Sequence, residues 1–110
     1  MNQYHEPYEL LDDETREITR AIRSLIEEFE AVDWYNQRAN VTTDEELKGV
    51  LIHNRDEEME HAAMTLEWLR RKMPELDYEL KENLFKTGPI SGDHGNEENT
   101  KEEPVGLSVE

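Results

Sequence analysis

Apolar residues recur at alternating intervals of three and four positions over two long stretches of the chain. In the first stretch, which begins at Asp12 or Asp13, they are Ile18, Ala21, Ile22, Leu25, Phe29 and Val32. In the second stretch they are Leu47, Val50, Leu51, Ala62, Leu66 and Leu69. This spacing is typical of helices that pack against another helix. We therefore expect two long helices.

Residues with known capping and helix-breaking preferences mark the ends of these helices. The first helix should fade over residues 37–41, and Thr43 with Glu46 reads as a capping box that opens the second helix. Pro74 should end the second helix, because the residue before a proline disfavours helical backbone. A short third helix is then predicted over residues 75–86.

The short connection between the long helices predicts an antiparallel hairpin. With 110 residues, 35% of them hydrophobic, the chain has too little apolar surface for a self-sufficient core. The expected fold is therefore all-α, a two-helix hairpin plus a short C-terminal helix that dimerises into a four-helix bundle. We divide the chain into an irregular N-terminal arm (1–11), the helical domain (12–87) and an acidic tail expected to be disordered (88–110).

Charge and composition exclude several classes of function. The chain has 28 acidic and 12 basic residues, a formal net charge of −16, so neither nucleic acid nor an anionic membrane is an expected partner. With no cysteine there are no disulfides, thiolate zinc sites or iron–sulfur clusters. We see no signal peptide and no membrane-spanning run, which is compatible with a cytoplasmic location. Such an acidic surface attracts metal cations.

The candidate chemistry lies at Glu58 and His61, which lie one helical turn apart and can share one metal ion. In so acidic a chain about one such pair is expected by chance, and a solvated surface pair is one reading. However, the pair interrupts a stripe that begins and ends with leucine, and Glu28 interrupts the apolar face of the first helix. Counted from the bend, Glu28 and Glu58 fall at a similar height. The other alternative is that these polar residues form hydrogen bonds at an interface and make the pairing of the helices specific.

Glu28, Glu58 and His61 together make up half of the ligand set of a dimetal carboxylate site. Such bundles use one Glu from each of two helices and a Glu-x-x-His from each of the other two. A two-fold pair of hairpins would supply two copies each of Glu28, Glu58 and His61. Oxygen and nitrogen ligands without sulfur suit non-haem iron, and less selectively manganese or zinc.

Neighbouring residues suggest supporting roles. Glu27, Glu30 and Trp34 share a face beside Glu28 and fit a transient site where metal enters, with a plain solvated acidic face as the alternative. Tyr35 fits a hydrogen-bond donor to a ligating carboxylate, or alternatively a core aromatic residue. His53 lies about 80° around the helix from His61, so we interpret it as a surface or interface residue.

Two blocks, residues 27–39 and 54–63, closely resemble the encapsulated ferritins, hairpin ferritins carried inside encapsulin shells. The resemblance covers most of residues 4–90. It implies a ferritin-like ferroxidase that oxidises Fe(II) with dioxygen at a diiron site between two subunits, with dimers assembled into an annular decamer. It also implies delivery of iron for mineral storage inside an encapsulin nanocompartment in the cytoplasm.

The same resemblance assigns individual residues. Glu28, Glu58 and His61 match the diiron ligands, and Glu27 and Glu30 match residues where metal enters. Trp34 and Tyr35 flank the site, Trp34 as a neighbour and not as a ligand. Calcium, zinc and manganese are expected substitutes at these positions.

The C-terminal sequence resembles a peptide that docks cargo to the encapsulin shell protein. The segment is Val105-Gly106-Leu107-Ser108-Val109, and it lacks the basic end often seen in such peptides. Two other functions stay open from sequence. One is a non-enzymatic acidic helical module for dimerisation or as an adaptor, and the other is a different dimetal enzyme of the rubrerythrin-like or manganese catalase-like kind.

Overall fold

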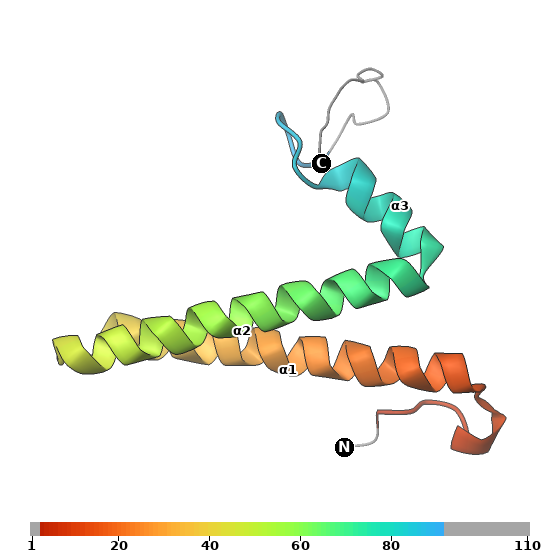
Figure 1. Cartoon of the computed structure of the whole chain (residues 1–110), viewed down its shortest axis with the longest axis horizontal. Coiled ribbons are helices and arrows are strands. Elements are labelled where there is room, and N and C mark those ends of the chain that lie inside the picture. Colours follow the sequence, from red (N-terminus) through yellow and green to blue (C-terminus); the bar gives the residue numbers. More distant parts are fainter. Residues whose placement is uncertain (1–2, 92–110) are drawn as a thin grey trace. The chain divides into compact units, whose positions relative to one another are not determined.

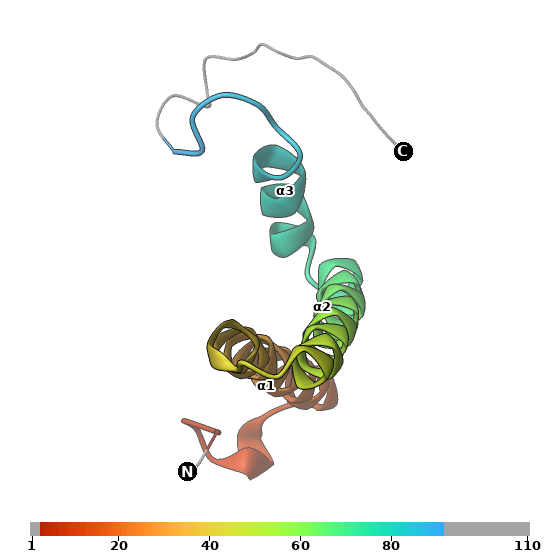
Figure 2. The same ribbon diagram turned by 90° about the vertical axis from the view of Figure 1, so that its left-hand side faces the viewer.

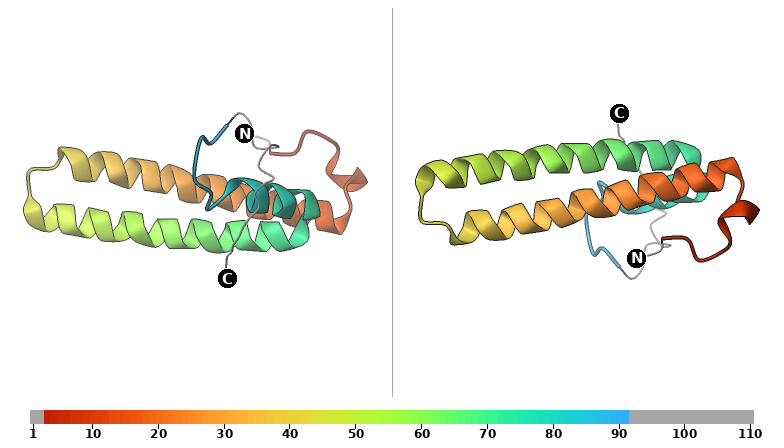
Figure 3. Two further views of the ribbon diagram at one scale, coloured as in Figure 1. Left: turned by 90° about the horizontal axis from the view of Figure 1, so that it is seen from above. Right: turned by 90° about the horizontal axis from the view of Figure 1, so that it is seen from below.

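The computed structural model describes residues 3–91, which contain three α-helices, one 3-10 turn and no strand. The 3-10 turn η1 spans Tyr8–Leu10, and the helices are α1 (Asp13–Val41), α2 (Glu45–Lys72) and α3 (Pro74–Asn83). Helices α1 and α2 run antiparallel and lie side by side along their length (Figures 1 and 3). The predicted all-α hairpin with a short third helix is confirmed.

The two long helices begin at aspartate caps. The Asp12 carboxylate accepts a hydrogen bond of 2.8 Å from the backbone N–H of Thr15, as the sequence suggested for the start of α1. At α2 the cap is Asp44, which accepts from the N–H of Leu47 at 2.9 Å. The prediction of Thr43 as cap was therefore wrong by one residue. Aspartate caps a helix at least as well as threonine, and Thr43 is left outside the helix.

Pro74 lies at the junction of α2 and α3. Helix α2 ends at Lys72, where the N–H of Met73 still reaches the carbonyl of Leu69 at 2.9 Å. Pro74 is then the first residue of α3, a position that suits proline because no N–H is needed there. Helix α3 starts one residue earlier and ends three residues earlier than predicted. Shortly after its end Phe85 adopts a left-handed φ of 58°, which a helix cannot continue through.

The described residues fall into two compact units that divide after Tyr78, and the hairpin belongs to the first. In the N-terminal arm, the Arg16 guanidinium lies 3.9 Å from the centre of the Tyr8 ring and donates a 2.6 Å hydrogen bond to the Tyr8 carbonyl. The arm expected to be irregular thus includes one 3-10 turn held against the start of α1. Most of the predicted acidic tail, including the candidate docking peptide at 105–109, lies outside the described residues.

The hairpin has a thin core. Viewed along its length, two helices face each other in one layer (Figure 2). Among the described residues, the buried apolar side chains are Ala39, Leu51, Ala62 and Leu69, with exposed fractions of 3–9%. Large apolar side chains stay exposed on the outside, including Phe29 at 55% and Met64 at 58%. The shortage of core predicted from composition is therefore present in the structure.

Candidate metal centre

Glu58 and His61 lie one helical turn apart on α2, where Glu58 is half-buried and His61 is exposed. Nδ1 of His61 is 3.5 Å from Oε1 of Glu58, and their side chains are 46% and 28% exposed respectively. The buried residues of α2, namely Leu51, Ala62 and Leu69, fall on the same stripe of the helix. The predicted polar interruption of an apolar stripe is thus present, although Leu47 at its start is 48% exposed.

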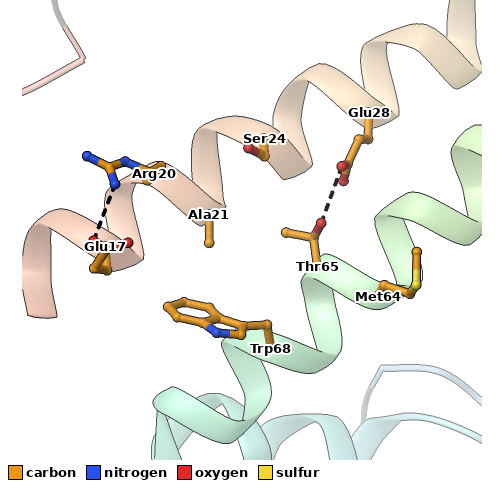
Figure 4. Close-up of a pocket in the computed structure, with 8 residues that line it drawn as sticks. All are labelled: Glu17, Arg20, Ala21, Ser24, Glu28, Met64, Thr65 and Trp68. Carbon is orange, nitrogen blue, oxygen red and sulfur yellow. Dashed lines mark hydrogen bonds and ion pairs between the residues drawn. The ribbon is translucent and has the colours of Figure 1, made fainter.

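Glu28 projects from α1 toward α2 and is half-buried. The Thr65 hydroxyl donates a hydrogen bond of 3.3 Å to Oε2 of Glu28 (Figure 4). The other oxygen, Oε1, is buried and has no hydrogen-bond partner. Leaving a buried acceptor unpaired costs about 1–3 kcal/mol, so native structures usually supply a partner such as water or an ion. A carboxylate oxygen left free in this way fits the demands of a hard metal cation.

Helix register sets which groups meet across the hairpin. Counting from the bend predicts Glu28 and Glu58 at one height, and this stays a prediction. The Glu28 carboxylate meets Thr65, which follows Glu58 by seven residues or about 10 Å of helix. The reason is that helical side chains tilt toward the N-terminus of their own helix. In an antiparallel pair these directions are opposite, so the Glu28 side chain reaches a residue of α2 that lies farther from the bend, namely Thr65.

One hairpin therefore does not complete a metal site by itself. Within residues 3–91 no group of three or more His, Cys, Asp or Glu side chains converges closely enough to hold a metal ion. Such a lack of converging ligands is expected if each chain carries half of the site, because the remaining ligands would then come from a second copy. That the second copy supplies them stays a prediction.

The other predicted residues lie around this region. Tyr35 is half-buried, and the Arg38 guanidinium lies 5.6 Å from the centre of its ring. Trp34 is 51% exposed, and Glu27 and Glu30 are exposed. Exposure suits residues where metal enters, but it also suits a solvated acidic face. The roles of these four residues remain predictions.

His53 occupies a different side of α2. Its Nε2 is 3.2 Å from Oε2 of Glu57, and the two side chains are 70% and 56% exposed. This agrees with its interpretation as a surface histidine. The pair has the same chemical groups as Glu58 and His61 but lies outside the seam of the hairpin, which makes it a matched control for the candidate site.

One residue beside the site was given no role from sequence. Thr65 follows His61 by one turn of α2, and its hydrogen bond to Glu28 joins residues 37 positions apart. Only the register of the hairpin reveals that pairing. Thr65 and Glu28 line an open groove between α1 and α2 with Glu17, Arg20, Ala21, Ser24, Met64 and Trp68 (Figure 4).

The fold and site define a class, a helical hairpin that carries a half-buried glutamate on one helix and a Glu-x-x-His pair on the other. The EncFtn-like family model matches residues 3–87. The chain therefore belongs to the EncFtn-like family, and the resemblance to encapsulated ferritins inferred from two sequence blocks is confirmed.

Known relatives are similar over most of the chain. An "Encapsulated ferritin-like protein" of Rhodospirillum rubrum is 57% identical over 90 residues, which are 82% of this chain and 64% of that protein. A "Ferritin-like protein" of Thermotoga maritima is 56% identical over 82% of this chain and 79% of its own length. An "Encapsulin nanocompartment cargo protein EncC" of Myxococcus xanthus is 39% identical over 64% of this chain and 55% of its own length. The chain thus spans less than two thirds of the Rhodospirillum and Myxococcus proteins.

A solved structure shares the fold. The crystal structure of a protein from Nitrosomonas europaea superposes with a TM-score of 0.79 at 59% sequence identity, covering 83% of this chain and all of that one. No helix among the residues that the structure describes is both long and apolar enough to cross a membrane.

Proposed function

We propose that the protein is a ferroxidase that oxidises Fe(II) to Fe(III) with dioxygen at a diiron site formed between two subunits. The observation that carries this proposal is the buried, unpartnered Oε1 of Glu28 on a hairpin whose other helix carries the adjacent Glu58 and His61. These residues provide carboxylate oxygen and imidazole nitrogen without sulfur, a set that suits iron. Membership of the EncFtn-like family supports the same reading.

Two chains are needed to assemble the ligands. Each hairpin offers one Glu28, one Glu58 and one His61, and a two-fold pair offers six groups, the full complement of a dimetal carboxylate bundle. Within residues 3–91 of one hairpin no group of three or more potential ligands converges, which favours this arrangement over a site inside one hairpin. Exposed apolar side chains such as Phe29 and Trp68 supply surface that such pairing would bury.

In the proposed reaction Fe(II) is the substrate and dioxygen the oxidant. Two Fe(II) ions release two electrons, and one dioxygen takes up these electrons with two protons to give hydrogen peroxide. If water is the product, four Fe(II) ions and four protons are consumed per dioxygen. Carboxylates favour the ferric product because they carry negative charge, and Tyr35 would donate a hydrogen bond to a ligand.

Uptake of iron would use the acidic surface. The chain carries a formal net charge of −16, which raises the local concentration of cations. Glu27 and Glu30 are exposed one and two positions from Glu28, with Trp34 beside them, and would hold iron on its way to the site. Calcium, zinc and manganese would compete at the same oxygen-rich positions.

We further propose that the dimers build an annular decamer that acts as cargo of an encapsulin nanocompartment in the cytoplasm. The names of the Rhodospirillum and Myxococcus relatives support this, since one is an encapsulated ferritin-like protein and the other an encapsulin cargo protein. The Val105–Val109 segment would dock to the shell protein. The ring would deliver ferric iron to the shell interior for mineral storage.

The test compares iron oxidation by the wild type, His61→Ala and His53→Ala. Fe(II) is added anaerobically, oxygen is then admitted, and ferric absorbance and oxygen consumption are followed. We expect His61→Ala to lose about 10-fold or more of the rate and His53→Ala to keep it. Equal rates for all three proteins would remove the site assignment.

The same experiment separates the alternatives. A non-enzymatic helical module predicts no stoichiometric iron binding and no effect of Glu28→Ala. A rubrerythrin-like or manganese catalase-like enzyme predicts peroxide turnover that exceeds iron oxidation. Adding hydrogen peroxide in place of oxygen therefore distinguishes a ferroxidase from these dimetal enzymes.

A further inference from the structure

We infer that Thr65 is a positioning residue, whose hydroxyl holds one oxygen of Glu28 so that the other oxygen stays directed at the metal. The inference rests on the proposed iron site, to which it adds one residue. Thr65 comes one turn after His61 and two turns after Glu58 on the same stripe of α2, so a role beside these residues requires no movement of the helix.

The contact treats the two oxygens of Glu28 differently. Oε2 accepts from the Thr65 hydroxyl at 3.3 Å, whereas the buried Oε1 accepts from nothing. A hydroxyl has a single proton to donate, and here it is donated across the hairpin rather than to the carbonyl of the preceding turn. The carboxylate is thus fixed through one oxygen and available through the other, which favours binding of a metal by Oε1 alone.

The side chain chosen for this contact is stiff. Threonine is branched at Cβ and has few χ1 rotamers in a helix, so few other side-chain conformations compete with this contact. In Figure 4 Thr65 points across the groove to Glu28, while Ser24 lines the same groove from α1. Partners that orient a ligating carboxylate typically change metal affinity or activity by 10- to 100-fold when removed, roughly the effect expected here.

The test measures metal affinity under anaerobic conditions, with Fe(II) and with Co(II) as a spectroscopic probe. Wild type is compared with Thr65→Val, which keeps the shape and loses the donor, Thr65→Ala, which loses both, and Thr65→Ser, which keeps the donor. We expect dissociation constants about 10-fold or more higher for Val and Ala, with an altered Co(II) visible spectrum, and about wild-type values for Ser. Ser24→Ala, in the same groove, should bind as wild type.

Circular dichroism of each metal-free variant checks that the hairpin is formed. Weak binding by Thr65→Val with wild-type binding by Thr65→Ala would mean that the valine side chain packs badly. Weak binding by Thr65→Ser as well as by the other variants would mean that loss of the hydroxyl is not the cause. Either result overturns the inference. Unchanged binding in all variants overturns it while leaving the proposed ferroxidase intact. If the wild type binds neither Fe(II) nor Co(II), the proposed function and this inference fail together.

Discussion

Arg55 on α2 donates a hydrogen bond of 3.0 Å from Nη1 to Oδ1 of Asn36 on α1. Together with the bond from Thr65 to Glu28, this pair defines the register of the hairpin. In both pairs the α1 side chain leans away from the bend and the α2 side chain leans toward it, as expected for antiparallel helices. Within one chain the Glu28 carboxylate therefore meets Thr65, and we propose that a second chain supplies the remaining metal ligands.

Replacing Glu28 should change the stability of the protein and its iron binding in opposite directions. Its Oε1 is buried without a partner, so Glu28→Leu in the metal-free protein should raise the free energy of unfolding by about 1 kcal/mol while abolishing iron binding. Urea unfolding and anaerobic iron titration measure the two effects. Glu17→Leu is the control, because Glu17 is exposed on the same helix and should give no such gain. A marked loss of stability in Glu28→Leu would show that Glu28 is a structural residue.

The start of α2 offers a test of the corrected cap. Asp44 accepts the N–H of Leu47, whereas Thr43 lies outside the helix. Asp44→Ala should therefore lower the free energy of unfolding by about 1 kcal/mol, and Thr43→Ala by much less. Chemical denaturation of both variants decides the matter. The assignment fails if the two substitutions have equal effects or if Thr43→Ala costs more.

The C-terminal turn of α2 predicts a pH dependence of stability. Hydrogen bonds from Arg70 and Arg71 lower the pKa of Glu67 to about 2 from its ordinary 4.5. A depressed folded-state pKa means that the ion pair stabilises the protein above pH 4.5 and that this contribution disappears as the pH falls toward 2.

The variant Glu67→Gln tests this dependence. Its thermal midpoint should lie below that of the wild type at pH 6, and the difference should close by about pH 2. Glu60→Gln removes one exposed carboxylate of the same helix without touching Arg70 or Arg71, and serves as the control. A difference between wild type and Glu67→Gln that stays constant from pH 6 to pH 2 would contradict the assignment.

Local patterns predicted most of the fold. Apolar spacing located both long helices, and Pro74 correctly marked the end of α2. The errors fell at boundaries, where neighbouring residues compete. Asp44 replaced Thr43 as cap because both are suitable caps, and α3 ended at Asn83. The periodicity of apolar residues does not predict the left-handed backbone conformation of Phe85.

The candidate site was predictable only as far as it depends on one helix. The contact between Glu58 and His61 follows from their spacing on α2. The contact between Glu28 and Thr65 depends on the register of two helices and on the opposite tilt of their side chains, which counting residues from the bend does not include. This is why the sequence did not predict the contact between Glu28 and Thr65.

The central claim is that two chains share one diiron site, and the most direct test is the iron stoichiometry of a species of known mass. Anaerobic Fe(II) titration of the wild type and of His61→Ala, followed by native mass spectrometry, measures iron and chain number together. The account predicts one site iron per chain, bound in dimers or larger even-numbered assemblies, and its loss in His61→Ala. Iron bound equally well by single chains, or bound unchanged in His61→Ala, would contradict it.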